Sequence, residues 1–188
     1  DAINFCNREL VDGIIAIGGG SVMDLSKAIK SYLAVGEQDM IKLINFKNDY
    51  PKKIPSILIP TTHGTASEVT MWGTIWDMHE NKKYSISHPS LYPDFAILDG
   101  QLTVTLPKDI SIYTIMDALS HSFEAIWNKR ANNKSTAYAI SAISTILNKA
   151  ILLKKNFHDL DLRNELLYAS TTAGLAFSST ATAAAHSI

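Results

Sequence analysis

Residues 13–32 combine an apolar run, a glycine turn and a helical pattern, and this order constrains the fold more than any other feature. The run at 13–17 is β-rich and apolar, as expected of a strand buried on both faces of a parallel sheet. Four small residues follow at 18–21, and apolar residues then recur at helical spacing through 22–32. We therefore predict an α/β fold with a ligand site where this strand ends and the helix begins.

The glycine turn suits a phosphate group. Glycine lets the backbone come close to an anion, and the first N–H groups of the helix point towards it. The candidate residues are Gly18, Gly19, Gly20 and Ser21, with Ser21 in the capping position. Met23 stands where the usual dinucleotide fingerprint has its third glycine, and no P-loop sequence follows. A structural tight turn explains the pattern equally well, with Asp24 and Lys27 as surface residues one turn into the helix.

A second apolar run at 54–60 predicts another buried strand, and a loop rich in hydroxyl groups follows it. In open α/β sheets, ligands bind beyond the carboxyl ends of the strands. We therefore regard Thr61, Thr62 and Thr65 as candidate cofactor contacts. A Ser/Thr turn that caps the next element is an equal alternative. His63, inside this loop, is expected to face either the ligand or solvent.

The composition of the chain changes near residue 106. Before it, short apolar runs alternate with helical patterns, and after it the spacing is helical throughout. We predict an α/β domain at 1–106 and an all-α domain at 107–188. The further expected elements are strands at 71–76, 84–88 and 94–99, and helices at 2–10, 108–118, 114–129, 135–154 and 160–188, with a helix break near Ser111.

Asp117 and His121 are four residues apart in the predicted helical region, which places both side chains on one helix face, one turn apart. A carboxylate and an imidazole that converge in this way can hold a divalent metal. Further ligands must come from elsewhere in the chain, and His186 is the best later candidate. An isolated pair of this kind is more often an ordinary helix ion pair, so the spacing alone leaves both interpretations open.

The composition also excludes several classes of protein. Acidic and basic residues nearly cancel, to a formal net charge of −1, which argues against binding to nucleic acid or to an anionic membrane. Cys6 is the single cysteine, so no internal disulfide forms and a reducing, cytoplasmic compartment is expected. We see no apolar run that approaches the roughly 20 residues of a membrane span. A small molecule is the expected partner.

Three motifs in this order resemble the iron-containing (group III) alcohol dehydrogenases. That family carries a G-G-G-S-x-x-D turn, a P-T-T-x-G-T-x-S-E-V-T loop and a D-A-L-x-H-x-x-E-A helix. The chain has them at residues 18–24, 60–70 and 117–125, and the segment at 173–178 and His186 are also similar to the family. The resemblance covers essentially all of the sequence.

The resemblance implies an α/β dinucleotide-binding domain followed by an all-α metal-binding domain, the dehydroquinate synthase-like fold. Asp117, His121 and His186 would be three of four metal ligands, for Fe(II) or Zn(II). Gly18, Gly19, Gly20 and Ser21 would contact the pyrophosphate of NAD(H) or NADP(H), and Asp24 is similar to an acidic residue of the same turn. Thr61, Thr62 and Thr65 would lie over the nicotinamide half, and Lys83 would contact the cofactor ribose. We also expect a homodimer or a higher homo-oligomer.

The expected reaction is hydride transfer between the nicotinamide and a primary alcohol or aldehyde. The segments at 70–77 and 82–93 are also similar to the phosphonoacetaldehyde reductase branch of the family, which is the alternative substrate class. A non-catalytic nucleotide-binding fragment is a further alternative. We expect both domains to be incomplete, with the fourth metal ligand beyond Ile188 and the first strand before Asp1. The choice between NAD and NADP cannot be made from these residues.

Overall fold

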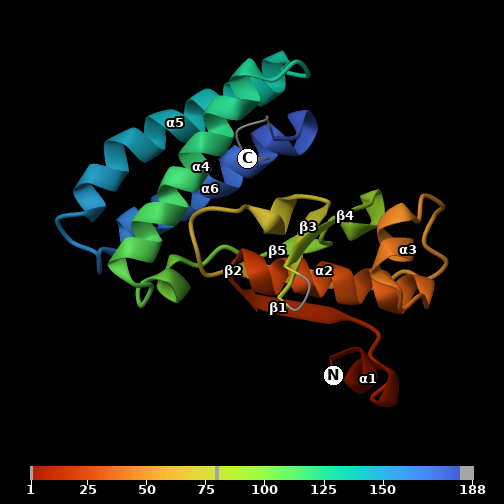
Figure 1. Ribbon diagram of the computed structural model, residues 1–188. Coiled ribbons are helices and arrows are strands. Elements are labelled where there is room, and N and C mark those ends of the chain that lie inside the picture. Colours follow the sequence, from red (N-terminus) through yellow and green to blue (C-terminus); the bar gives the residue numbers. More distant parts are fainter. Residues whose placement is uncertain (1, 79–80, 183–188) are drawn as a thin grey trace.

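The computed structural model describes residues 2–78 and 81–182, and Figure 1 shows that an α/β part is followed by a part made of three long helices. His186 lies outside the described residues, so its predicted role as a ligand has no structural description. The arrangement agrees with the predicted order of an α/β region and then an all-α region. The boundary at residue 106 stays a prediction.

A parallel sheet in the order β1-β2-β5 forms the centre of the α/β part. Its strands are β1 (Ile14–Gly18), β2 (Ser56–Pro60) and β5 (Phe95–Ala96), and β5 is much shorter than the predicted strand at 94–99. Helix α2 (Gly20–Val35) packs on one face, where Met23 lies in a core cluster with Ala16 and Leu58. The sheet and this helix place the glycine turn next to the loop that follows β2.

The expectation that the first strand is buried on both faces is wrong for β1. Ile15 and Ile17 are 67% and 57% exposed, whereas Ala16 between them is 4% exposed. Alternate side chains of a strand point to opposite faces, and only the face towards α2 is covered within the described residues. The apolar run was correctly read as a strand, but its composition did not show which face is covered.

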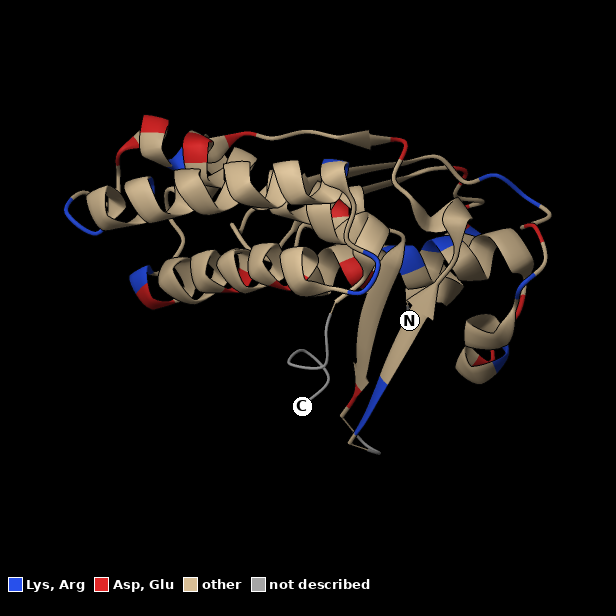
Figure 2. Cartoon of the chain, turned by 90° about the horizontal axis from the view of Figure 1, so that it is seen from above, with Lys and Arg blue, Asp and Glu red and all other residues tan. Residues whose placement is uncertain are grey.

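A hairpin and two short helices complete the α/β part. The antiparallel strands β3 (Trp72–Asp77) and β4 (Lys82–Ser87) match the predicted pair. The short helices are α1 (Ala2–Arg8) and α3 (Met40–Asn45), and three single 3-10 turns lie at η1 (Ser67–Val69), η2 (Pro89–Leu91) and η3 (Gly100–Thr103). As Figure 2 shows, the hairpin projects beside the helices, on the same side as the last described residues of the chain.

The helical part consists of α4 (Lys108–Trp127), α5 (Asn133–Leu153) and α6 (Leu160–Thr180). Asn132 caps α5 through a capping box, and Asp159 caps α6 by accepting a hydrogen bond from the Leu162 amide. The three helices bury one cluster that includes Ile115, Ile146 and Leu166. Their packing supplies a rigid support for the side chains that α4 and α6 turn towards the α/β part.

The predicted helix break near Ser111 is wrong, because α4 is continuous. The Ser111 amide donates to the carbonyl of Pro107 at 2.8 Å, as in an uninterrupted first turn. The Ser111 side chain is fully buried, and its hydroxyl accepts a hydrogen bond from the Arg163 guanidinium of α6. A distant residue therefore satisfies the polar group that made this position look like a break.

Helix α5 corrects the expectation that no segment is long and apolar enough to span a membrane. It has 21 residues, and an 18-residue window within it has a mean hydropathy of 1.4. One such helix is weak evidence for a membrane span, because core helices of soluble proteins have the same character. Here α5 packs against α4 and α6 and contributes Ala142 and Ile146 to their shared core.

Small residues allow the two parts to approach each other closely. A Cβ added to Gly64, in the loop after β2, would lie 2.9 Å from the Cβ and the carbonyl oxygen of Thr114 on α4. A Cβ added to Gly174 on α6 would meet Ala66 and would lie 2.7 Å from Cγ2 of Val69. Both contacts join the threonine loop to the helices.

We predict that Gly174→Ala lowers the free energy of unfolding by about 1–3 kcal/mol, the usual cost of overpacking. This loss should occur although alanine is about 1 kcal/mol better than glycine inside a helix. Chemical denaturation followed by circular dichroism measures it. Gly13→Ala is the control, because its added Cβ would lie at an ordinary 3.5 Å from Cγ of Pro55. Equal stabilities of the two variants would contradict the close contact at Gly174.

Candidate active site

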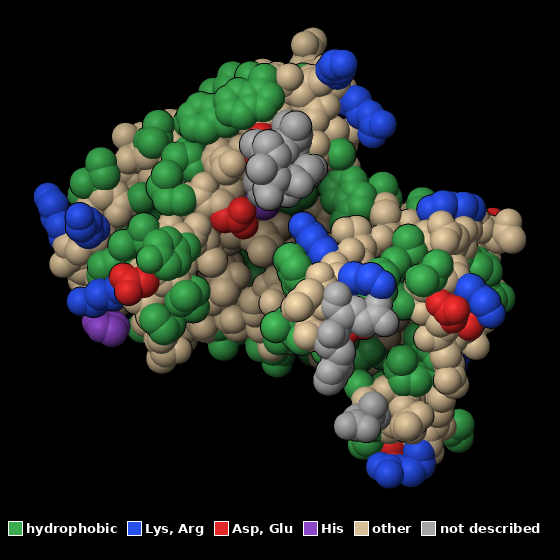
Figure 3. Space-filling model, in the orientation of Figure 1, with side chains coloured by type: hydrophobic (Ala, Val, Ile, Leu, Met, Phe, Trp, Pro, Cys, Tyr) green, Lys and Arg blue, Asp and Glu red, His purple; other side chains and the backbone are tan. Residues whose placement is uncertain are grey.

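A cavity of about 600 Å³ lies between the α/β part and the helices. Five of the residues singled out in the sequence line it: Asp24, Thr65, Lys83, Asp117 and His121. Figure 3 shows the surface hollowed between the two parts, with acidic, basic and histidine side chains around the hollow. The volume is typical of a site for a small molecule or part of a cofactor. The fold therefore brings the predicted metal ligands and part of the predicted cofactor set to one place.

Asp117 and His121 lie on one face of α4, as their spacing predicted. Oδ2 of Asp117 is 3.9 Å from Nδ1 of His121, and the imidazole is nearly buried whereas the carboxylate is about one-third exposed. The ring of His121 stacks on Phe177 of α6, with ring centroids 4.3 Å apart. A carboxylate and an imidazole at this separation suit both a weak ion pair and two ligands of a metal.

The donor set fits a metal only in part within residues 2–78 and 81–182. No group of three or more histidine, cysteine, aspartate or glutamate side chains there could hold a metal ion. Asp117 and His121 supply one oxygen ligand and one nitrogen ligand, which suit iron or zinc. A complete site needs at least one more donor, and the candidate His186 lies outside the described part of the chain. The ligand set stays a prediction.

The glycine turn and the threonine loop are in contact. The Thr61 amide donates to the carbonyl of Gly18 at 3.0 Å. A Cβ added to Gly19 would lie 3.1 Å from Cγ2 of Thr62. At Gly20 an added Cβ would lie 2.6 Å from Cγ2 of Thr65. A side chain at position 20 would therefore force the loop or the Thr65 side chain to move, and one at position 19 would make a tight contact with Thr62.

Ser21 is not the cap of α2, contrary to its predicted position. The cap residue is Gly19, which has no side chain to bond to the first turn, and Ser21 already lies within the helix. The amides of Val22 and Met23 donate to the carbonyl of Gly19, at 3.1 and 3.2 Å. A glycine cap keeps side-chain atoms away from the helix N-terminus, an arrangement that favours an anion there.

Asp24 and Lys27 are not surface residues. The carboxylate of Asp24 accepts hydrogen bonds from the Ser67 hydroxyl at 2.7 Å and the Thr74 amide at 2.8 Å. Burial raises the pKa of Asp24, and these two bonds oppose the rise. Its carboxylate joins α2 to η1 and the hairpin, while it also lines the cavity. The predicted contact of Asp24 with a cofactor is neither supported nor contradicted by this role.

Lys27 is 1% exposed. Its ammonium donates to the carbonyl of Trp72 at 2.6 Å and to the Thr70 hydroxyl at 3.1 Å. Burial lowers the pKa of Lys27 to about 8, and the carboxylates of Asp24 and Glu68 oppose that change. Helical spacing placed Lys27 one turn from Asp24, but it gave no sign that a hairpin 45 residues later would cover them.

Both expectations for His63 are wrong. Its side chain is 0% exposed and does not line the cavity described above, so it faces neither solvent nor this candidate site. Burial, together with the positive charge of Arg163, lowers the pKa of His63 to about 3. The imidazole is therefore neutral near pH 7. The neighbouring Gly64 packs on α4, and this contact turns the loop inward.

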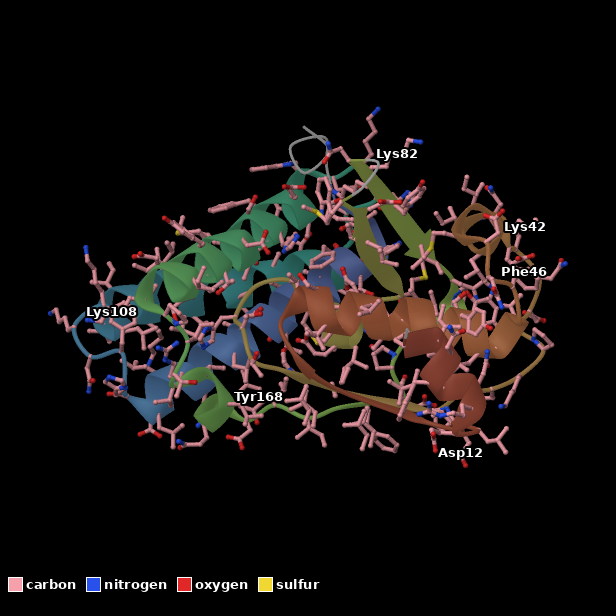
Figure 4. All side chains as sticks on the ribbon, turned by 60° about the horizontal axis from the view of Figure 1, so that its bottom comes forward. Asp12, Lys42, Phe46, Lys82, Lys108 and Tyr168 are labelled. Atoms are coloured by element: carbon pink, nitrogen blue, oxygen red, sulfur yellow. The ribbon has the colours of Figure 1, made fainter. Side chains whose placement is uncertain are left out.

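Lys83 lies on β4 and lines the cavity, whereas its neighbour Lys82 lies at the tip of the hairpin and points away from the body of the molecule (Figure 4). The ammonium of Lys83 lies 5.8 Å from the ring centroid of Trp76. This is the loose geometry of an exposed cation–π contact. The position of Lys83 is compatible with a cofactor or a substrate, and the predicted contact with ribose stays a prediction.

The sequence interpretation missed two aromatic residues of the cavity. Trp72 and Phe177 line it. Their rings stack with centroids 6.1 Å apart, which brings β3 and α6 together. Trp72 follows the threonine loop closely in the sequence, and this position could have indicated that it lies near the site. Phe177 belongs to the segment at 173–178 that resembles the family, but only the packing of α6 on α4 brings it to His121.

Two profiles of known protein families together match nearly the whole chain. The profile described as "Iron-containing alcohol dehydrogenase" matches residues 1–100. The profile described as "Fe-containing alcohol dehydrogenase family, C-terminal" matches residues 111–188.

Relatives by sequence include a probable alcohol dehydrogenase, EutG, of Salmonella typhimurium. It is 36% identical over 177 residues, which is 94% of this chain and 45% of that protein. The NAD-dependent methanol dehydrogenase of Bacillus methanolicus is 35% identical over 192 residues, covering 100% of this chain and 49% of that enzyme. The chain thus spans about half the length of these relatives.

Solved structures resemble the fold closely. Sulfoacetaldehyde reductase from Bifidobacterium kashiwanohense, in complex with NAD+, has a TM-score of 0.90 and 30% identity, covering 98% of this chain and 49% of that one. A 1,3-propanediol oxidoreductase has a TM-score of 0.91 and 31% identity over 99% of this chain and 48% of that one. From the profile matches and these relatives, the chain belongs to the iron-containing alcohol dehydrogenase family.

Proposed function

We propose that this chain is part of a metal-dependent, NAD(P)-linked alcohol dehydrogenase or aldehyde reductase. One observation carries the proposal: Asp117 and His121 share a single cavity with Thr65 and Lys83. Chemistry between a nicotinamide and an alcohol needs the cofactor and the activated oxygen in contact. The shared cavity supports the proposal that the two halves of such a site lie together. Iron is the proposed metal because of the family, with zinc as the alternative.

Each group has a defined part in this proposal. Asp117 and His121, with His186, would hold a divalent metal, which when bound supplies Lewis acidity towards the alcohol or aldehyde oxygen. The glycine turn and the threonine loop would bind the dinucleotide, which supplies or accepts the hydride. Trp72 and Phe177 form the apolar part of the wall and exclude water from the reacting atoms.

NAD(H) is the proposed cofactor, with NADP(H) as the alternative. The proposal draws support from two relatives: the sulfoacetaldehyde reductase structure contains NAD+, and the methanol dehydrogenase is described as NAD-dependent. We further propose a cytoplasmic homo-oligomer, which remains to be tested by the mass of the native particle and by cell fractionation.

We predict that His121→Ala reduces bound metal from about one ion per subunit to near zero and abolishes turnover. The reason is that the loss of a nitrogen ligand makes the affinity for the metal too low for the site to be occupied. Metal analysis and NADH oxidation with short aldehydes are measured on the same sample of the protein expressed from its complete reading frame. His158→Ala is the control, since His158 is exposed at the loop between α5 and α6. Full metal content in His121→Ala would remove His121 as a ligand. Wild-type protein without metal or turnover would favour the non-catalytic nucleotide-binding alternative.

A second prediction concerns the glycine turn. Gly20→Val places branched carbon atoms where Thr65 lies, so the loop must move away from the start of α2. We expect the dissociation constant for NAD(H) to rise at least tenfold while the metal content stays unchanged. Quenching of tryptophan fluorescence measures the affinity. An unchanged titration would contradict a dinucleotide site at this turn.

An anionic aldehyde, such as phosphonoacetaldehyde, is the second candidate substrate. The observation in its favour is the cation: Lys83 lines the same cavity as Asp117 and His121. The hydroxyls of Thr70, Thr74 and Ser85 add donors to that wall, and such groups suit a phosphonate or a sulfonate. The similarity to a sulfoacetaldehyde reductase also supports this class.

Lys83→Ala separates the two possible roles of this lysine. If Lys83 binds the substrate anion, the KM for phosphonoacetaldehyde should rise on the order of tenfold, the loss of one charged hydrogen bond, while the KM for propionaldehyde stays the same. If it binds the cofactor ribose, the KM for NADH should rise with both aldehydes. Lys82→Ala is the control at the neighbouring position that points away from the cavity. A rise confined to NADH would contradict the anionic class.

A further inference from the structure

Three rings form a stack that crosses from the α/β part to the helices. Trp72 of β3 stacks on Phe177 of α6, with centroids 6.1 Å apart and an interplanar angle of 19°. Phe177 stacks in turn on His121 of α4, at 4.3 Å and 27°. We propose that this stack, anchored by Lys27, is a positioning device that fixes the ring plane of His121 for metal binding. The inference rests on the proposed function and extends it to residues outside the predicted ligand set.

The far end of the stack is held by a buried ammonium. Lys27 donates a hydrogen bond to the carbonyl of Trp72, the first residue of β3, and another to Thr70, two residues earlier. The carboxylate of Asp24 accepts from the Thr74 amide, two residues further along the same strand. Helix α2 therefore holds this segment through the Thr70 hydroxyl and the Trp72 carbonyl at one position, and through the Thr74 amide at the other. A strand held at both positions leaves Trp72 little freedom to shift.

The middle of the stack is held by the helical core. Phe177 is 4% exposed and packs in a cluster with Ala125, Ala139 and Ala176, while Trp72 packs against the same cluster. Close packing of this kind restricts an aromatic side chain to one rotamer. The face of Phe177 presented to His121 is therefore fixed before any metal arrives.

Stacking and the ion-pair contact restrict His121 in different ways. The ring of Phe177 sets the plane of the imidazole, and Asp117 lies at 3.9 Å from Nδ1 on the preceding turn of the same helix. Loss of a hydrogen-bonding partner that orients a ligating histidine typically costs 10–100-fold in metal affinity or activity, and a stacking partner that orients the ring acts in the same sense. A histidine held in advance also loses less rotamer entropy when it binds. The stack thus favours metal binding without supplying a ligand.

A structural contact alone would not predict these effects. Trp72 and Phe177 could serve only to pack β3 against α6, and their loss would then lower stability while the metal site stayed intact. The two interpretations differ in the affinity and in the geometry of the bound metal. Both quantities are measurable in a folded variant, independently of turnover.

The first experiment compares Phe177→Leu with Phe123→Leu. Phe123 lies on α4 two residues from His121 and stacks on Trp127, with centroids 6.0 Å apart and rings 10° from parallel, so the control also loses one aromatic stack. Metal-free protein from the complete reading frame is titrated with Co²⁺, whose visible absorption reports both affinity and coordination geometry. We expect Phe177→Leu to bind Co²⁺ on the order of tenfold more weakly, with a changed spectrum. Phe123→Leu should match the wild type.

Variants at the other end of the stack keep the test decisive if Phe177→Leu does not fold. Trp72→Leu should weaken Co²⁺ binding in the same direction, and Trp72→Phe should restore most of it because a flat ring remains. Lys27→Met keeps the apolar stem but loses the ammonium. It should also lower the affinity for Co²⁺, by a smaller factor. Circular dichroism on each sample shows whether the helices are intact.

The outcomes separate this inference from the proposed function. Wild-type affinity and spectrum in folded Phe177→Leu or Trp72→Leu would overturn the positioning role and leave the proposed metal site in place. A wild-type protein that binds no Co²⁺ and no iron would overturn the proposed function, and this inference with it. Weaker binding in both stack variants, with Phe123→Leu unchanged, supports the inference.

Discussion

The burial of the Lys27 ammonium under β3 is the interaction on which the site most depends. A buried charge without partners is unfavourable by several kcal/mol. Lys27 therefore requires the carbonyl of Trp72, the Thr70 hydroxyl and the nearby carboxylates of Asp24 and Glu68. These partners lie on α2, η1 and the start of β3. If the hairpin moved away from α2, the Lys27 ammonium would lose its hydrogen-bond partners. One wall of the cavity is therefore fixed to the helix that follows the glycine turn.

Glu68 extends this network to the helical part. Its Oε1 accepts a hydrogen bond from Thr171 of α6 at 2.7 Å, and burial raises the pKa of its carboxyl group. The threonine loop is thus joined to α2 through Asp24 and Ser67, and to α6 through Glu68. Polar contacts are directional, whereas the apolar contacts around them are not. The directional contacts decide the register of the loop, and the apolar clusters supply most of the stability.

Local spacing predicted the features that depend on local geometry. A separation of four residues places Asp117 and His121 on one helix face in any α-helix, and a strand followed by glycines predicts a turn at a helix start. Three of the failures depend on distant partners. Arg163 donates a hydrogen bond to Ser111, 52 positions earlier, and its charge acts on His63, about 100 positions earlier. The carbonyl of Trp72 accepts a hydrogen bond from Lys27, 45 positions earlier. No periodic pattern contains such pairs, so the burial of His63 and Lys27 and the continuity of α4 required the tertiary structure.

Two glycines bring the threonine loop close to the helices. Gly64 lets the threonine loop touch Thr114, which lies three residues before Asp117. Gly174, which lies three residues before Phe177, lets α6 touch Ala66. Ala66 adopts a left-handed conformation with φ of 49°, which is unfavourable for alanine by about 1 kcal/mol and persists only where packing demands it. Larger groups at these contacts would separate the loop from both helices. Glycine at positions 64 and 174 therefore keeps the predicted cofactor loop close to α4 and α6, the two helices that carry His121 and Phe177 of the aromatic stack.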